Sequence, residues 1–376
     1  MSRNVGLYIH IPFCMKKCFY CDFVSFSDVE DDIIAEYFSS LKRELIFYKE
    51  NYDIKIDTIY IGGGTPSVVA ISHIGSLLEF VYCNFKVENY CETTIEANPE
   101  SLDEEKIKFY CSSGINRLSV GIQSLNDVEL KALGRIHTSK RALEMLELVT
   151  KYFENFSVDL MIGIVHQSIE SFSDTLGKVL KVNPPHVSVY SLKIEEGTHF
   201  YNRYESIKSH LPSEEEERNM YWFAVQTLYS SGIHHYEISN FAKENFKCKH
   251  NLKYWDYEEY IGIGCAAHSF FDGYRYFNTA SLEDYISRIK NGEFAWEDRQ
   301  LIDDFEKEKE YIILGLRKIE GFELSEFERR FNVVFTEKYK TQIEKLKRYG
   351  LVEINSHFKL TKKGIDLANI VWQEFI

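Results

Sequence analysis

Residues 6–23 read GLYIHIPFCMKKCFYCDF and place Cys14, Cys18 and Cys21 directly after an alternating, strand-like run. A structural zinc site takes four protein ligands, and ferredoxin-type clusters take four cysteines. Three thiolates on one short loop therefore leave one metal position without a protein ligand. The alternative is a structural zinc loop completed by His10 or a distant cysteine. An open position is where a small molecule can bind a metal and react.

The first two-thirds of the chain alternates short apolar runs with longer amphipathic stretches. This alternation predicts parallel strands joined by crossover helices. Six such units fall short of a closed eight-fold barrel, so we expect an α/β fold with a partial, TIM-like (β/α)6 barrel. The predicted strands span 7–11, 57–63, 91–97, 116–122, 157–163 and 186–192, and the predicted helices span 31–50, 70–82, 103–112, 139–152, 169–181 and 213–232.

The pattern changes after about residue 301 to helices and one hairpin. Residues 338–369 have the order helix, strand, turn, strand, helix, which is typical of a winged helix. We therefore expect three parts. They are a barrel at 1–235, an aromatic- and histidine-rich segment at 236–300 that packs on the barrel, and a small winged-helix-like α+β domain at 301–376.

Polar or glycine-rich residues stand at the ends of nearly all the predicted strands. In barrels of this kind the chemistry lies at the C-terminal ends of the strands. The cysteine loop, GGGTPS (62–67), Glu96, Gln123 and Ser191 occupy these ends, and Asp159 lies near the middle of the fifth strand. We expect these groups to share one site.

Composition narrows the class of protein. The chain has 376 residues and a net charge of −14, which is unfavourable for binding nucleic acid or an anionic membrane surface. It has no apolar run of about 20 residues that would span a bilayer. The N-terminal residues lack a signal-peptide pattern, so we expect a cytoplasmic protein. In such a chain, clustered cysteines indicate metal or catalysis more than disulfides.

The segment CMKKCFYC (14–21), with Tyr20 before its last cysteine, resembles the C-x3-C-x2-C loop of the radical S-adenosylmethionine superfamily. GGGTP (62–66) resembles a second element of that superfamily. The resemblance implies that Cys14, Cys18 and Cys21 hold a 4Fe-4S cluster. It also implies that the fourth iron takes the amino and carboxylate groups of S-adenosylmethionine, which accounts for the missing protein ligand.

Further segments resemble one branch of the superfamily, which contains the oxygen-independent coproporphyrinogen III oxidases and the heme chaperones of the HemW type. These segments are YIHIPFC, IEANPE, GIQS, LGRIH and VDLMIG. Carboxylates suit an ammonium group or ribose hydroxyls, and arginine suits a carboxylate. The resemblance implies that S-adenosylmethionine is bound by Tyr8, Tyr20, Gly63, Gly64, Thr65, Glu96, Gln123, Arg135 and Asp159.

Three features favour the chaperone side of this branch. Phe23 stands where the oxidases carry a further cysteine, the cluster strand begins near residue 5, and HNLKYW (250–255) matches the chaperones' HN-x-x-YW motif. The expected function is binding heme and delivering it to acceptor hemoproteins, without coproporphyrinogen III oxidase activity. The alternative is that oxidase activity, a radical decarboxylation of propionate side chains. A homodimer and peripheral contact with membrane hemoproteins are left open.

The motif HNLKYW also has a chemical interpretation. Histidine is a common axial ligand of heme iron, and aromatic neighbours can cover the porphyrin face. The resemblance to the chaperone branch, rather than this chemistry alone, implies that His250 ligates heme, with His268, Cys248 and Cys265 as rival ligands. The alternative is a buried turn in which His250 forms hydrogen bonds and the aromatic side chains pack.

Overall fold

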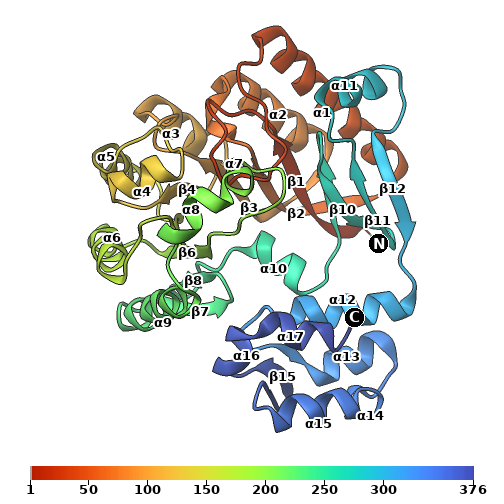
Figure 1. Cartoon of the computed structure of the whole chain (residues 1–376). Coiled ribbons are helices and arrows are strands. Elements are labelled where there is room, and N and C mark those ends of the chain that lie inside the picture. Colours follow the sequence, from red (N-terminus) through yellow and green to blue (C-terminus); the bar gives the residue numbers. More distant parts are fainter. Residues whose placement is uncertain (1) are drawn as a thin grey trace.

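Six parallel strands form the centre of the structure, a computed structural model that describes residues 2–376 (Figure 1). Neighbouring strands pair in chain order, so each connection crosses over to the next parallel strand. The expected partial barrel is therefore confirmed. The strands are β1 (Arg3–Ile11), β2 (Ile54–Gly63), β3 (Lys86–Ala97), β4 (Arg117–Gln123), β5 (Phe156–Ile162) and β6 (His186–Ser191).

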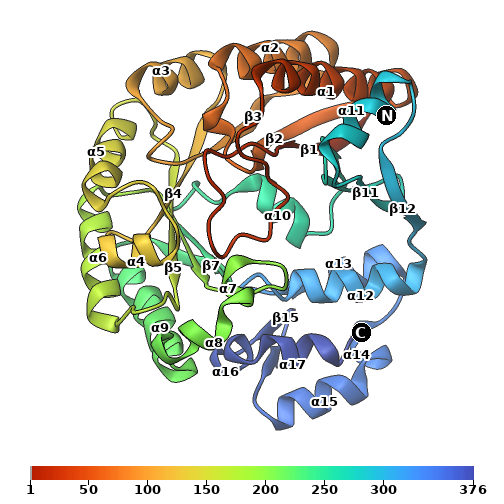
Figure 2. The same cartoon turned by 45° about the horizontal axis from the view of Figure 1, so that its top comes forward.

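Helices surround these strands on the outside (Figure 2). The expected start of one helix is confirmed, because Ser213 caps it and Glu216 bonds back to the Ser213 backbone in a capping box. The short α4, α7 and α8 were not predicted. The helices are α1 (Asp31–Asn51), α2 (Ile71–Asn84), α3 (Glu104–Ser112), α4 (Asp127–Ala132), α5 (Ser139–Val149), α6 (Ile169–Lys181), α7 (His199–Asn202), α8 (Tyr204–Ile207) and α9 (Glu214–Ser230), with single 3-10 turns η1 (Pro66–Val68) and η2 (Lys208–His210).

Residues 234–301 extend the sheet at both edges to twelve strands. A short hairpin pairs with β6, and a parallel strand followed by antiparallel ones continues from β1. Helix α10 lies between the two edges and packs on β2 (Figure 2). The added elements are β7 (His234–Glu237), β8 (Asn240–Ala242), α10 (Lys249–Trp255), β9 (Tyr260–Ile263), β10 (His268–Phe271), β11 (Tyr274–Asn278), α11 (Leu282–Lys290) and β12 (Trp296–Leu301).

The six parallel strands have an apolar outer face and a polar inner face. On β4, Leu118 and Val120 are fully buried in the main apolar core. Between them Ser119 faces the interior and donates a hydrogen bond to Asp159 on β5. This alternation follows from the two-residue period of a strand. The barrel interior is therefore lined by hydrogen-bonding groups rather than filled by aliphatic side chains.

The C-terminal residues form a small domain with its own apolar core, built around four fully buried phenylalanines, Phe322, Phe327, Phe335 and Phe358. The expected order helix, strand, turn, strand, helix over 338–369 is confirmed, and a third short strand joins the sheet. No helix within residues 2–376 is long and apolar enough to cross a membrane. The elements are α12 (Asp304–Gly315), β13 (Phe322–Glu323), α13 (Leu324–Phe331), α14 (Phe335–Lys338), α15 (Lys340–Arg348), β14 (Val352–Ile354), β15 (His357–Leu360), α16 (Lys362–Asp366) and α17 (Ala368–Gln373).

Candidate functional site

The cysteine loop leaves β1 and is closed at its base by two backbone hydrogen bonds. Cys14 N donates to Phe26 O at 2.9 Å, and Phe26 N donates to Pro12 O at 2.7 Å. Cys14, Cys18 and Cys21 are partly exposed free thiols on this loop. Among residues 2–376, no three His, Cys, Asp or Glu side chains lie close enough together to surround a single metal ion.

The middle of the loop is held by segments that follow β4 and β6. Phe19 N donates to Leu133 O, and Phe200 N donates to Phe19 O, both at 3.0 Å. The Phe19 ring lies directly against Gly134, where a Cβ atom would come within 2.9 Å of the ring. Tyr20 packs beside it on the small apolar cluster that contains Leu133 and Phe200. These contacts tie the cysteine loop to both partner segments.

Arg135 reaches the loop from the same segment as Gly134. Its Nη1 lies 3.5 Å from Cys18 Sγ, and its Nη2 donates to Gly121 O at 2.9 Å. Glu100 lies 3.6 Å from Nη2 and accepts a 2.9 Å hydrogen bond from His137. A buried guanidinium beside a thiol favours the negative charge that the sulfur carries as a metal ligand.

Cys14 is tied to the GGGTP turn. Its Sγ lies 3.4 Å from Thr65 Oγ1, which also accepts a 3.0 Å hydrogen bond from Asn98. Burial raises the pKa of Cys14, and it raises the pKa of Cys21 to about 11. Both are therefore neutral thiols at neutral pH in the metal-free protein, and metal binding would release their protons.

The glycines of the turn let β2 end against the cysteine loop. Gly63 has a φ of +109°, and a Cβ there would lie 2.5 Å from the His10 ring. Gly64 N donates to Ile11 O at 2.9 Å, and a Cβ on Gly64 would lie 2.8 Å from Phe13 O. Only glycine fits at these two positions.

Glu96 lies at the end of β3 beside this turn. Its carboxylate accepts hydrogen bonds from Tyr60 OH at 2.7 Å and from Gly63 N at 3.2 Å. Burial raises the pKa of Glu96 to about 7, although the Tyr60 hydrogen bond opposes this, and the charge of Asp159 raises it further. Asp159 itself accepts hydrogen bonds from Ser119 and Ser157, each at 2.8 Å.

Several buried polar atoms have no hydrogen-bond partner within residues 2–376. Among those near the barrel mouth are Oε1 of Gln123, which ends β4 with a φ of +60°, and Nε of Arg135. S-adenosylmethionine offers both donors and acceptors, so these unpaired groups, together with Glu96 and Asp159, fit such a molecule. The glycine turn and the three thiols lie at the same end of the barrel.

Tyr8 and His10 project from β1 toward the other side of the loop. Tyr8 OH and His10 Nδ1 are 3.0 Å apart, and His10 Nε2 lies 3.0 Å from Val24 O. Burial raises the pKa of Tyr8 and lowers the pKa of His10. His10 thus ties Tyr8 to the end of the cysteine loop through contacts at both ring nitrogens.

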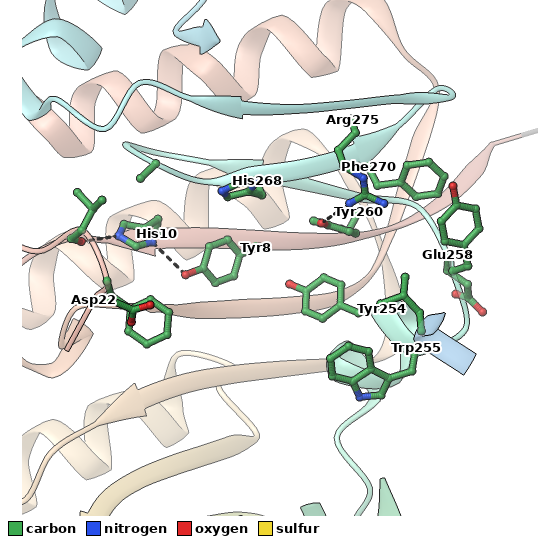
Figure 3. A pocket seen from close by; sticks show the side chains of 15 residues that line it. Tyr8, His10, Asp22, Tyr254, Trp255, Glu258, Tyr260, His268, Phe270 and Arg275 are labelled. Carbon is green, nitrogen blue, oxygen red and sulfur yellow. Dashed lines mark hydrogen bonds between the residues drawn. The ribbon is translucent and has the colours of Figure 1, made fainter. Parts of the chain in front are cut away.

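A cavity of about 500 Å³ opens next to Tyr8 (Figure 3). One wall is the end of the cysteine loop, and the others are the end of α10, the strands β9 to β11 and Leu314 of α12. Its lining is mostly aromatic. Among the lining side chains are Tyr8, His10, Tyr254, Trp255, Tyr260 and His268.

The two candidate heme-ligating histidines are placed differently. His250 is fully buried, with Nδ1 2.8 Å from Thr58 Oγ1 and Nε2 2.8 Å from Tyr254 OH. Burial lowers the pKa of His250 to about 3. Ligation of iron by His250 would require one of these hydrogen bonds to break. His268 is exposed and lines the cavity.

The rival cysteines are also buried away from the cavity lining. Cys248 precedes α10, and its Sγ lies 3.6 Å from Oε1 of Glu92 on β3. Cys265 is fully buried in the main core, and neither cysteine lines the cavity. The sequence alone did not point to Tyr260 or Arg275, which also line the cavity. For Arg275 the signal was the Asp-Gly turn at 272–273 between two aromatic runs, a typical hairpin pattern.

The chain is similar to known proteins over most of its length. A model of the radical SAM superfamily matches residues 8–179, and a model of the HemN C-terminal domain matches residues 305–367. A solved structure of the Escherichia coli coproporphyrinogen III oxidase HemN, described as a radical SAM enzyme, superposes with a TM-score of 0.88. It is 21% identical in sequence and covers 100% of this chain and 90% of that one.

Two curated relatives that the chain matches over nearly their whole length carry the same name. The heme chaperone HemW of Lactococcus lactis subsp. lactis (strain IL1403) is 36% identical, over 100% of this chain and 98% of its own. The heme chaperone HemW of Bacillus subtilis (strain 168) is 35% identical, over 98% of both chains. The chain therefore belongs to the HemW family within the radical SAM superfamily.

Proposed function

We propose that this protein binds heme in the cavity beside Tyr8 and delivers it to acceptor hemoproteins. The relatives named heme chaperone support this function. The observation that carries it is the cavity itself, whose volume of about 500 Å³ and aromatic walls suit a flat macrocycle. It lies next to the cysteine loop, so a porphyrin there would neighbour the cluster site.

We propose His268 as the axial ligand of the heme iron. Its imidazole lines the cavity and stacks on Phe277 with ring centroids 5.1 Å apart, and partial desolvation of the ring lowers its pKa. A neutral imidazole has a free ring nitrogen for iron. His250 then has another role, because its hydrogen bonds to Thr58 and Tyr254 hold α10 and the Tyr254 side chain against the cavity.

We also propose that Cys14, Cys18 and Cys21 hold a 4Fe-4S cluster. The residues proposed to hold S-adenosylmethionine are Tyr8, Tyr20, Gly63, Gly64, Thr65, Glu96, Gln123, Arg135 and Asp159. A bound cluster supplies an electron to S-adenosylmethionine. The chain's own part is to present three thiols, to place Arg135 at Cys18, and to leave Gln123 Oε1 and Arg135 Nε unpaired at the barrel mouth. Zinc in place of iron and sulfide in anaerobically purified protein would overturn this assignment.

The experiment is a heme titration of anaerobically reconstituted protein, followed by its absorption spectrum. We expect one heme per chain, and loss of the axial-ligand signature in His268→Ala. His234→Ala is the matched control, because His234 is an exposed residue outside the cavity lining. An unchanged spectrum in His268→Ala contradicts the assigned ligand.

A porphyrinogen assay on the same sample separates the carrier from the oxidase. With reductant and S-adenosylmethionine, the carrier should leave coproporphyrinogen III unchanged. Formation of protoporphyrinogen would instead establish the decarboxylase, in which hydrogen is removed from a propionate side chain and carbon dioxide is lost.

A further inference from the structure

The cavity has one lysine or arginine among its described lining residues, Arg275 of β11. Arg275 forms a two-point ion pair with Glu310 of α12, with Nε to Oε1 at 3.1 Å and Nη2 to Oε2 at 2.8 Å. Both side chains are about one-third exposed, at 32% and 28%. The pair therefore joins the cavity wall to the C-terminal domain while both groups still reach solvent.

Arg275 and His268 belong to the same face of one hairpin. In the β10–β11 pairing His268 is opposite Phe277 and Phe270 is opposite Arg275. Residues that are opposite each other on neighbouring strands share a face of the sheet. The two pairs are two residues apart along β10, which separates the pairs by about 7 Å. This spacing is comparable to the distance from the iron of a heme to its propionate carboxylates.

The surroundings of Arg275 resemble a carboxylate site that is already filled. Its guanidinium lies over the Phe270 ring, 5.1 Å from the centroid, and Nη1 is 3.5 Å from Tyr260 OH. Figure 3 shows Arg275, Phe270 and Tyr260 gathered at one end of the cavity and His10 at the other. Arginine binds a carboxylate through two parallel hydrogen bonds, and Glu310 supplies that carboxylate here.

We propose that Arg275 anchors a heme propionate and that Glu310 occupies this anchor in the heme-free protein. This inference rests on the proposed function and names the group that orients the ligand. Binding exchanges one carboxylate for another on the same guanidinium, so Arg275 remains paired in both states. The exchange releases α12 from β11 while heme is bound. Return of Glu310 to Arg275 then competes with the propionate and favours heme release.

The test measures the heme dissociation constants of two variants, each lacking one partner of the ion pair. If the pair were only structural, both variants would change the affinity in the same direction. Glu310→Gln removes the competitor and should tighten heme binding about tenfold. Arg275→Gln removes the anchor and should weaken binding about tenfold, with partial rescue in Arg275→Lys. Glu374→Gln is the control, because Glu374 pairs with Lys345 elsewhere in the C-terminal domain and should leave the affinity unchanged.

The dimethyl ester of iron protoporphyrin IX lacks free carboxylates and provides the second arm. With this ester the wild-type protein, Glu310→Gln and Arg275→Gln should bind equally, whereas with heme they should separate. Weaker heme binding in both variants, or an unchanged affinity in Glu310→Gln, overturns the inference while the proposed function stands. A wild-type protein that binds no heme overturns both.

Discussion

Arg135 Nη1 lies 3.5 Å from Cys18 Sγ, although the two residues are 117 positions apart in the chain. The guanidinium is held there by the carbonyl of Gly121 and by Glu100. A positively charged donor beside a cysteine ligand stabilises the reduced, more negative form of a cluster more than the oxidised form. The contact therefore predicts a redox effect that does not depend on S-adenosylmethionine.

Arg135→Gln should lower the reduction potential of the reconstituted cluster by about 60 mV. This corresponds to the loss of one charge-assisted hydrogen bond, about 1.5 kcal/mol, in a one-electron couple. The measurement is a redox titration followed by electron paramagnetic resonance without S-adenosylmethionine. Arg141→Gln is the control, since Arg141 bonds to the carbonyls of Pro99 and Leu102. An unchanged potential at full iron content would contradict the proposed role.

Gly63→Ala should abolish cluster assembly while preserving the secondary structure. An alanine at a φ of +109° is strained, and its Cβ would lie 2.5 Å from the His10 ring. The measurement is iron and sulfide per chain after anaerobic reconstitution, alongside circular dichroism. Gly177→Ala is the matched control, because Gly177 lies within α6 with nothing within 4 Å of its Cβ position. That variant should assemble a full cluster and gain slight stability.

The barrel strands and most of its helices were predictable because their signals are local. Apolar alternation, caps such as Ser213 and turns such as Gly-Thr-Pro depend on neighbouring residues only. The edge strands from 260 to 301 were not predicted, because β9 pairs with β1 from more than 250 positions away. Long-range pairing of this kind leaves only the weak Asp-Gly hairpin signal in the sequence.

The cysteine loop and the barrel-mouth residues were named from motifs, but the surroundings of His250, which the sequence favoured as the heme ligand, could not be read from its motif. HNLKYW contains His250 whether that histidine points into a cavity or into the core. The structure separates the two cases through Thr58 and Tyr254, which are far apart in sequence and together engage both ring nitrogens. The ion pair of Arg275 and Glu310 joins two domains and has no sequence signature at all.

His250→Ala should lower the free energy of unfolding by roughly 2–4 kcal/mol. The substitution leaves the buried Thr58 hydroxyl unpaired and creates a cavity beside Tyr60, on which the His250 ring stacks at 5.2 Å. Denaturant unfolding of the cluster-free protein measures this loss. His234→Ala, at an exposed position, should change stability by less than about 0.5 kcal/mol. Equal stability of the two variants would show that His250 has no structural role.

Glu96 should make S-adenosylmethionine binding depend on pH near neutrality. Burial raises its pKa from the usual 4.5 to about 7, so the carboxylate becomes protonated as the pH falls through 7. The protonated form cannot attract the ammonium group or accept as many hydrogen bonds. Binding should therefore weaken below pH 7, approaching tenfold per pH unit.

The amino group of S-adenosylmethionine also titrates, so the pH dependence of wild-type binding alone is not enough. The relevant quantity is the ratio of the wild-type affinity to the Glu96→Gln affinity, measured by calorimetry on cluster-loaded protein from pH 6 to 8. Because glutamine does not titrate, this ratio should rise with pH and level off above 7, and a constant ratio would mean that Glu96 does not bind the ligand through its charge.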